Sequence, residues 1–133
     1  MKKLLVVLAL SLPVFANPAL FSKYELVRQS LLKEDLAAAQ KHAAALAIDA
    51  KAAKQPTVTE FAQSLAKSRD LAAARRSFGV LSDEMIKVRN AAKGTRPSVY
   101  YCPMVKKSWL QPKGQVGNPY DTAMAVCGEL KSE

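Results

Sequence analysis

The chain has 133 residues, the length of a single domain, and half of them are hydrophobic. Its 20 Lys and Arg against 11 Asp and Glu give a formal net charge of +9, which favours anionic partners such as nucleic acid, anionic lipid or acidic proteins. The basic residues are scattered, and no run of five or more occurs. The charge pattern therefore indicates a solvated basic surface and argues against nucleic-acid binding.

The first sixteen residues have the layout of a secretory signal peptide. Two lysines are followed by the apolar residues 4–12, then by Pro13 and a Val-Phe-Ala cleavage sequence. The apolar stretch is far shorter than the roughly 20 residues that a membrane span needs. No cysteine follows the cleavage point for lipid attachment. We therefore expect residues 1–16 to be a cleaved signal peptide, and residues 17–133 to form one periplasmic domain without a membrane span.

The sequence from residue 17 to residue 93 has the pattern of four amphipathic helices. The expected helix starts are, in chain order, Asn17-Pro18, Asp35, a capping box of Thr57 to Glu60, and Asp70. The apolar stripes are Leu20, Tyr24, Val27 and Leu31; Leu36, Ala39, Ala43, Leu46 and Ala50; Val58, Phe61, Ala62 and Leu65; and Leu71, Ala74, Phe78, Leu81, Met85, Val88 and Ala92. Because such helices cannot bury their stripes alone, the sequence predicts an all-α fold, an antiparallel bundle of about four helices.

The sequence changes character after the predicted bundle. Residues 94–120 hold most of the glycine and proline, and Ser98 to Tyr101 has the β-branched and aromatic residues of a short extended piece. Asn118-Pro119 repeats the cap-plus-proline pattern and predicts a short helix that runs toward Cys127 and ends at Gly128. We expect an irregular C-terminal loop followed by this short helix.

Four sulfur-containing side chains in this last third form the clearest candidate site. Cys102 and Met104 are two residues apart, which places them on the same side of an extended segment. Met124 and Cys127 are three residues apart, which places them on one face of a helix. Two thiolates and two thioethers select soft ions, Cu(I) before Zn(II). The sequence therefore predicts a Cu(I) site formed by Cys102, Met104, Met124 and Cys127, provided that the segment folds back on itself.

Each of these residues also has an ordinary structural role open to it. In an oxidising compartment Cys102 and Cys127 would form a disulfide, and closing a loop of about twenty-five residues would stabilise the fold by roughly 3–4 kcal/mol. Methionines more often fill gaps in a core than bind metal. His42, the only histidine, lies beside the apolar stripe of the second expected helix, where a boundary position is its usual role. The spacing leaves the metal site and the disulfide both open.

The same segment resembles a known family. The elements that carry the resemblance are Tyr101-Cys102-Pro103-Met104, Trp109-Leu110, Asn118-Pro119-Tyr120 and residues 124–129, with the stretches 76–78 and 81–85 upstream. They are similar to uncharacterised bacterial exported domains that occur alone or attached to periplasmic adaptor proteins of heavy-metal efflux pumps. The resemblance implies a helix-rich metal-binding domain in which Cys102, Met104, Met124 and Cys127 are the ligands.

These features favour a binding protein over an enzyme. The chain has no Cys-x-x-Cys, no glycine-rich phosphate loop and no His-Glu-x-x-His, and a Cys102–His42 pair would lack a third orienting group. We therefore predict a periplasmic protein that binds Cu(I) for buffering, resistance or delivery to an efflux adaptor or a copper protein. One alternative is a disulfide-stapled interaction module that binds no metal. Another is a redox sensor that releases its metal when Cys102 and Cys127 are oxidised.

Overall fold

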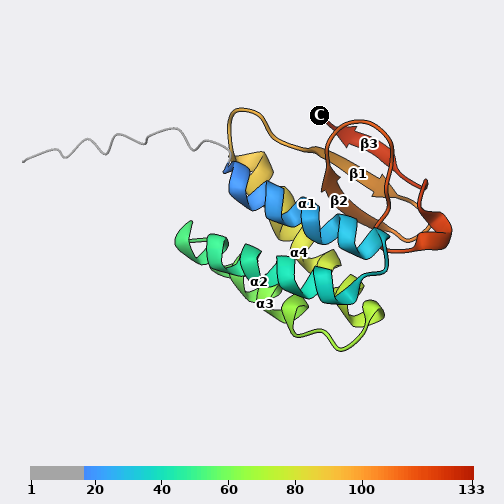
Figure 1. Ribbon diagram of the computed structural model, residues 1–133. Helices are drawn as coiled ribbons and strands as arrows, with labels where there is room; N and C mark the ends of the chain where they lie inside the picture. Colours follow the sequence, from blue (N-terminus) through green and yellow to red (C-terminus); the bar gives the residue numbers. More distant parts are fainter. Residues whose placement is uncertain (1–16) are drawn as a thin grey trace, which may run out of the picture.

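The computed structural model describes residues 17–133, and the expected signal peptide of residues 1–16 lies outside that range. Four α-helices come first (Figure 1): α1 (Pro18–Leu32), α2 (Leu36–Ala52), α3 (Pro56–Ala66) and α4 (Leu71–Ala91). Three strands follow, β1 (Ser98–Cys102), β2 (Lys107–Gln111) and β3 (Glu129–Ser132), with the 3-10 helix η1 (Thr122–Met124) before the last of them. Among the residues from 17 onward, no helix is both long and apolar enough to cross a bilayer.

Three of the helices start where the sequence predicts. Asn17, Asp35 and Asp70 each accept a hydrogen bond from a main-chain N–H in the first turn of α1, α2 and α4, at 3.1, 3.0 and 2.7 Å. Each side chain thereby satisfies an N–H that has no partner within its helix. The predicted capping box of Thr57 to Glu60 is wrong, because α3 begins at Pro56 and no side chain caps it. Pro56 already fits the first helical position, where its fixed φ is favourable and its missing N–H costs nothing.

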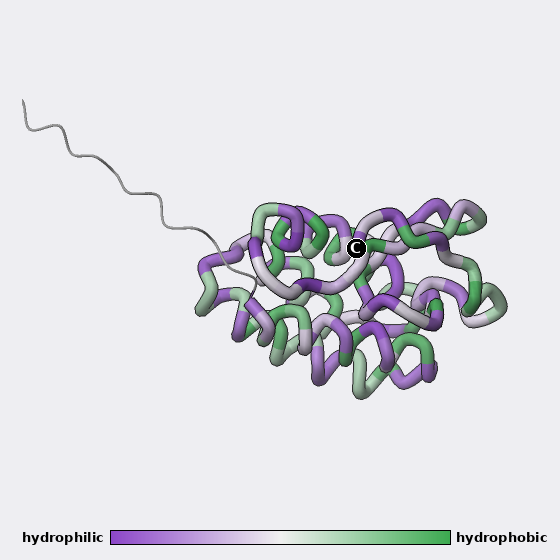
Figure 2. The backbone as a smooth tube through the Cα atoms, turned by 90° about the horizontal axis from the view of Figure 1, so that it is seen from above, coloured by the Kyte–Doolittle hydropathy of each residue, from purple (hydrophilic) through white to green (hydrophobic). Residues whose placement is uncertain are grey.

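The helices pack in chain order, α1 against α2, α2 against α3 and α3 against α4. The predicted stripes supply most of the core, and small side chains such as Ala43 and Ala62, both fully buried, let the helix backbones approach closely. Hydrophobic and hydrophilic residues alternate along the helical parts of the tube in Figure 2, as expected for helices with one buried face. The bundle therefore follows the sequence pattern closely.

The prediction of an all-α fold is wrong, because the C-terminal third forms a three-stranded antiparallel sheet in the order β2-β1-β3. β1 coincides with the predicted extended piece and pairs with β2, from Ser98 opposite Gln111 to Cys102 opposite Lys107. The intervening turn is closed by a bond from the Lys106 N–H to the Cys102 carbonyl, at 2.8 Å. The helix predicted before Cys127 is reduced to the single turn of η1, because the chain there turns back to supply β3.

Two tyrosine hydroxyls bond to the outer edge of β2, Tyr24 from helix α1 and Tyr120 from the loop that follows the strand. The Leu110 N–H donates to the Tyr24 hydroxyl at 3.1 Å, and that hydroxyl shares a second hydrogen bond of 2.6 Å with Ser82 of α4. Further along the same edge, the Tyr120 hydroxyl donates to the Ser108 carbonyl. These bonds satisfy main-chain groups that an edge strand would otherwise leave open to another chain. They also fix the sheet against α1 and α4.

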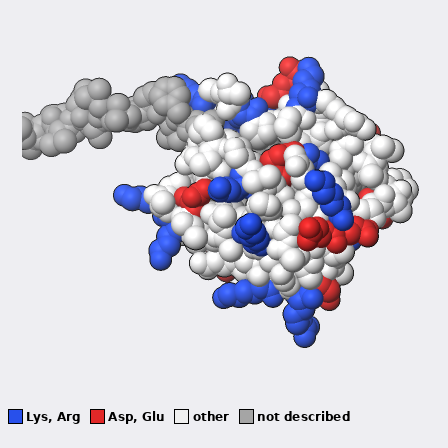
Figure 3. Space-filling model, viewed as in Figure 1, with Lys and Arg blue, Asp and Glu red and all other residues white. Residues whose placement is uncertain are grey.

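Basic side chains are dispersed over the surface. On the face shown in Figure 3, Lys and Arg are interspersed with Asp and Glu. Some form short-range ion pairs, such as Lys87 with Glu84 at 2.9 Å and Lys131 with Glu129 at 3.0 Å. This face carries no continuous basic stripe of the kind that tracks a nucleic-acid backbone.

Candidate functional site

The two cysteines form a disulfide at one corner of the sheet. Cys102 is the last residue of the central strand β1, and Cys127 lies between η1 and β3, with a Cα–Cα distance of 5.3 Å. Cys102 is fully buried, whereas Cys127 is partly exposed. The fold therefore brings together two residues that are 25 positions apart in the chain. We call these cysteines and the neighbouring Met104 and Met124 the sulfur corner.

The two methionines of the sulfur corner differ from the methionine of the core. Met85 is 0% exposed and packs inside the bundle, whereas Met104 is 68% exposed in the turn between β1 and β2. Met124 is half-buried in η1, and its carbonyl accepts the Cys127 N–H at 2.9 Å. Met104 therefore does not fill a gap in the core, and its thioether faces solvent.

Other metal-ligating side chains do not gather in the described part of the chain. Within residues 17–133, no three side chains of His, Cys, Asp or Glu lie close enough together to hold an ion. His42 is half-buried on α2, a helix that packs mainly on α1 and α3. A soft ion at the sulfur corner would therefore depend on sulfur donors. The two cysteines suit such an ion only as thiolates, that is, after the disulfide is reduced.

Asn118 holds the segment that carries Cys127. Its side chain is fully buried, donates to the Cys127 carbonyl at 3.3 Å, and accepts the Tyr120 N–H at 2.9 Å. Its own main-chain N–H donates to the Ala125 carbonyl at 2.9 Å. The predicted role of Asn118-Pro119 as a helix start is therefore wrong, since this asparagine crosslinks the two ends of the loop that leads to Cys127.

Two arginines from the bundle also donate hydrogen bonds to main-chain carbonyls of this loop. Arg28, which is 7% exposed and paired with Glu25, donates to the Gly117 carbonyl at 2.7 Å. Arg75 donates to the Pro119 carbonyl at 3.1 Å. The sequence predicts both as part of the solvated basic surface, whereas Arg28 is buried and Arg75 is half-buried. The position of Arg28, four residues after the buried Tyr24, was the signal that it lies on the inner face of α1.

Two glycines let this loop approach its supports. A Cβ atom on Gly117 would lie 2.6 Å from the Arg28 guanidinium. A Cβ atom on Gly128 would lie 2.8 Å from the Trp109 ring and 2.7 Å from Val116. Real Cβ atoms do not make such short contacts, so a larger residue at either position would displace the loop or the side chain that it meets. Gly128 thus has a packing role beside Cys127 and does not end a helix there.

Burial also fixes the protonation state of the tyrosine next to the sulfur corner. Tyr120 is 9% exposed, and burial raises the pKa of its hydroxyl well above the ordinary value of 10.0. The hydroxyl therefore stays protonated above pH 10, where an exposed tyrosine would ionise, and continues to donate to the Ser108 carbonyl. The ring also packs against Phe78 and Trp109, with centroid distances of 5.8 and 6.1 Å.

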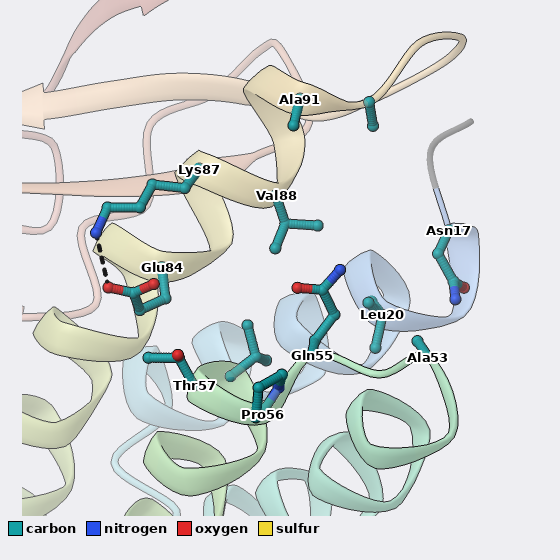
Figure 4. A pocket seen from close by; sticks show the side chains of 12 residues that line it. Asn17, Leu20, Ala53, Gln55, Pro56, Thr57, Glu84, Lys87, Val88 and Ala91 are labelled. Carbon is teal, nitrogen blue, oxygen red and sulfur yellow. Dashed lines mark hydrogen bonds and ion pairs between the residues drawn. The ribbon is translucent and has the colours of Figure 1, made fainter. Parts of the chain in front are cut away.

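A hollow of about 490 Å³ lies where α1 begins and α4 ends (Figure 4). The Gln55 amide, the apolar Leu20 and Val88, and the Glu84–Lys87 ion pair surround it. No Cys, Met or His of the described residues lines this hollow.

No protein-family model, curated protein or solved structure matches the chain. A functional assignment therefore rests on the chemistry of the sulfur corner.

Proposed function

We propose that this chain is an exported protein that binds Cu(I), or a similar soft ion, through the reduced Cys102–Cys127 pair. The observation that carries the proposal is the 5.3 Å Cα–Cα distance between two cysteines that are also held together by bonds other than the disulfide. Thiolates are the preferred donors for Cu(I), and two of them neutralise its charge. The exposed thioether of Met104, two residues after Cys102, and that of Met124, three residues before Cys127, are the further soft donors of the proposed site.

The bonds that keep the cysteines together do not depend on sulfur. β1 pairs with β3 in a register that places Tyr101 opposite Glu129, so the sheet links a residue next to Cys102 to a residue two positions after Cys127. Asn118 anchors the Cys127 carbonyl, and Arg28 and Arg75 anchor the loop before it. A reduced pair therefore stays close, and ordering the ligands costs little when an ion binds.

The biological setting follows from the sequence. The signal peptide expected at residues 1–16 would deliver the protein to the periplasm. The resemblance to domains attached to heavy-metal efflux adaptors supports a role in copper buffering, resistance or delivery to such an adaptor.

A competitive Cu(I) titration of the reduced protein against a chromophoric chelator tests the proposal. We expect one tight equivalent that is lost in Cys102→Ser and weakened in Met104→Leu and Met124→Leu. Met85→Leu is the matched control, because this methionine is buried in the bundle and outside the sulfur corner, and its binding should equal that of the wild type. Equal binding by wild type and Cys102→Ser would refute the proposal.

The disulfide itself favours a second candidate, an interaction module in which Cys102–Cys127 is a structural staple. The decisive measurement is a count of free thiols in protein isolated from the periplasm, together with its copper content. Two free thiols and bound copper support the metal-binding function. No free thiol, together with no Cu(I) retained after reduction, supports the staple.

A further inference from the structure

The disulfide is buried unevenly, and this asymmetry determines how it would be opened. Cys102 is 0% exposed at the end of the central strand. Cys127 is partly exposed in a connecting segment, and its neighbour Val126 is 80% exposed. One sulfur therefore belongs to the interior of the sheet region, and the other belongs to a segment at the surface.

We propose that a dithiol reductant, such as a thiol–disulfide oxidoreductase, opens this disulfide by attacking Cys127, with Cys102 as the leaving group. The proposal rests on the proposed function, which requires the reduced pair. A thiolate attacks a disulfide in line, from the side opposite the leaving sulfur. Cys127 is the partly exposed residue of the pair and Cys102 is fully buried, so approach from that side is open at Cys127 and closed at Cys102. Attack on Cys102 would require a nucleophile to enter through the packed sheet.

The reaction balances as two exchanges. The first thiolate of the reductant forms a bond to the Cys127 sulfur while the Cys102–Cys127 bond breaks, and the electron pair leaves on Cys102, which then takes a proton from water. The second thiolate of the reductant next attacks the first sulfur of the reductant and releases Cys127, which also takes a proton. The protein gains two electrons and two protons, and the reductant is oxidised to its disulfide.

The fold also explains why a thiol reductant must carry two thiols. After the first exchange, the freed Cys102 is still held near Cys127, because Asn118 and the two arginines keep the loop in place. Its effective concentration toward the mixed disulfide is therefore high, and it re-forms the original bond by expelling a monothiol. Only a second thiol on the same reductant completes the reduction before this recapture.

The first test compares two single-cysteine proteins. Cys102→Ala leaves the Cys127 thiol, and Cys127→Ala leaves the Cys102 thiol. Mixed with a chromogenic aromatic disulfide, folded Cys102→Ala should react about tenfold faster or more, because only its thiol is reachable. In concentrated urea the two proteins should react at the same rate. Equal rates in the folded proteins, or faster reaction of the Cys102 thiol, would overturn the proposal.

The second test uses the oxidised wild-type protein and does not depend on either variant. Dithiothreitol and glutathione are compared at equal thiol concentration, with free protein thiols counted after acid quenching. Dithiothreitol should open the disulfide about tenfold faster or more, because glutathione is expelled by recapture. Similar rates would overturn the dithiol requirement. No metal is present in either test, so a protein that opens through Cys127 but binds no Cu(I) would refute the proposed function and leave this inference standing.

Discussion

Reduction of the Cys102–Cys127 disulfide should lower the stability of the protein without unfolding it. The bond closes a loop of 25 residues, and the chain-entropy treatment assigns about 3.5 kcal/mol at 25 °C to such a loop. Domains of this size unfold with a free energy of about 5–15 kcal/mol, so a folded reduced form is expected. With a slope of about 1.5–2 kcal/mol per molar urea, the unfolding midpoint should fall by about 2 M.

Trp109 is the natural probe for this experiment. It is the only tryptophan, is fully buried, and contacts Gly128 next to Cys127. Its fluorescence is followed through urea titrations with and without a phosphine reductant. Cys102→Ala/Cys127→Ala is the control, because its midpoint should not respond to the reductant. Solvent-exposed tryptophan emission from the reduced protein in the absence of urea would refute the reasoning, since the hydrogen bonds of Asn118 and the arginines would then be insufficient to hold the cysteines together.

Three further predictions concern the rest of the structure. Tyr24→Phe should lower the free energy of unfolding in urea by about 1–3 kcal/mol, because the Leu110 N–H loses its acceptor, while Tyr101→Phe should change it by less than about 0.5 kcal/mol. Burial raises the pKa values of Tyr24 and Tyr120 above 10.0, so both hydroxyls ionise more readily in the unfolded chain than in the folded protein. Their contribution to the free energy of unfolding is therefore fully present below pH 10 and is lost as the pH rises further. Urea titrations at alkaline pH should measure a fall of up to about 2.7 kcal/mol per pH unit for the two groups. Peroxide should oxidise the exposed Met104 before the buried Met85, as peptide mass spectrometry would detect.

The helical part was predictable because its signals are local. The caps Asn17, Asp35 and Asp70 and the apolar stripes specify each helix within a few turns of sequence, and the structure confirms them. The sheet was not predictable in the same way. The residues of β2 include the charged Lys107 and the polar Gln111, and only pairing with β1 makes them a strand. β3 is exposed along its whole length and therefore has no apolar alternation to mark it.

The candidate site was also predictable only where its signals are local in the sequence. The predicted four-sulfur site required the segment to fold back on itself, and the structure brings the two cysteines together as the disulfide that was the alternative prediction. The groups that hold them there were missed, because Arg28 and Arg75 bond to carbonyl groups 89 and 44 residues away. The pattern within one helix cannot predict an acceptor so far away in the sequence. This holds even for Arg28, whose helical spacing indicates that its side chain faces inward.

The arrangement of these anchors bears on the choice between a staple and a metal site. A disulfide stabilises a fold chiefly by constraining the unfolded chain, so a staple needs no other native bonds to hold its two cysteines together. Here the main chain on either side of the pair is already fixed by β1–β3 pairing and by the buried Asn118. A structural staple would add to a geometry that other bonds already specify, whereas a pair of thiolates needs this geometry to be kept when the disulfide is absent. This second set of bonds is what the proposed function requires, because it keeps the reduced cysteines in place.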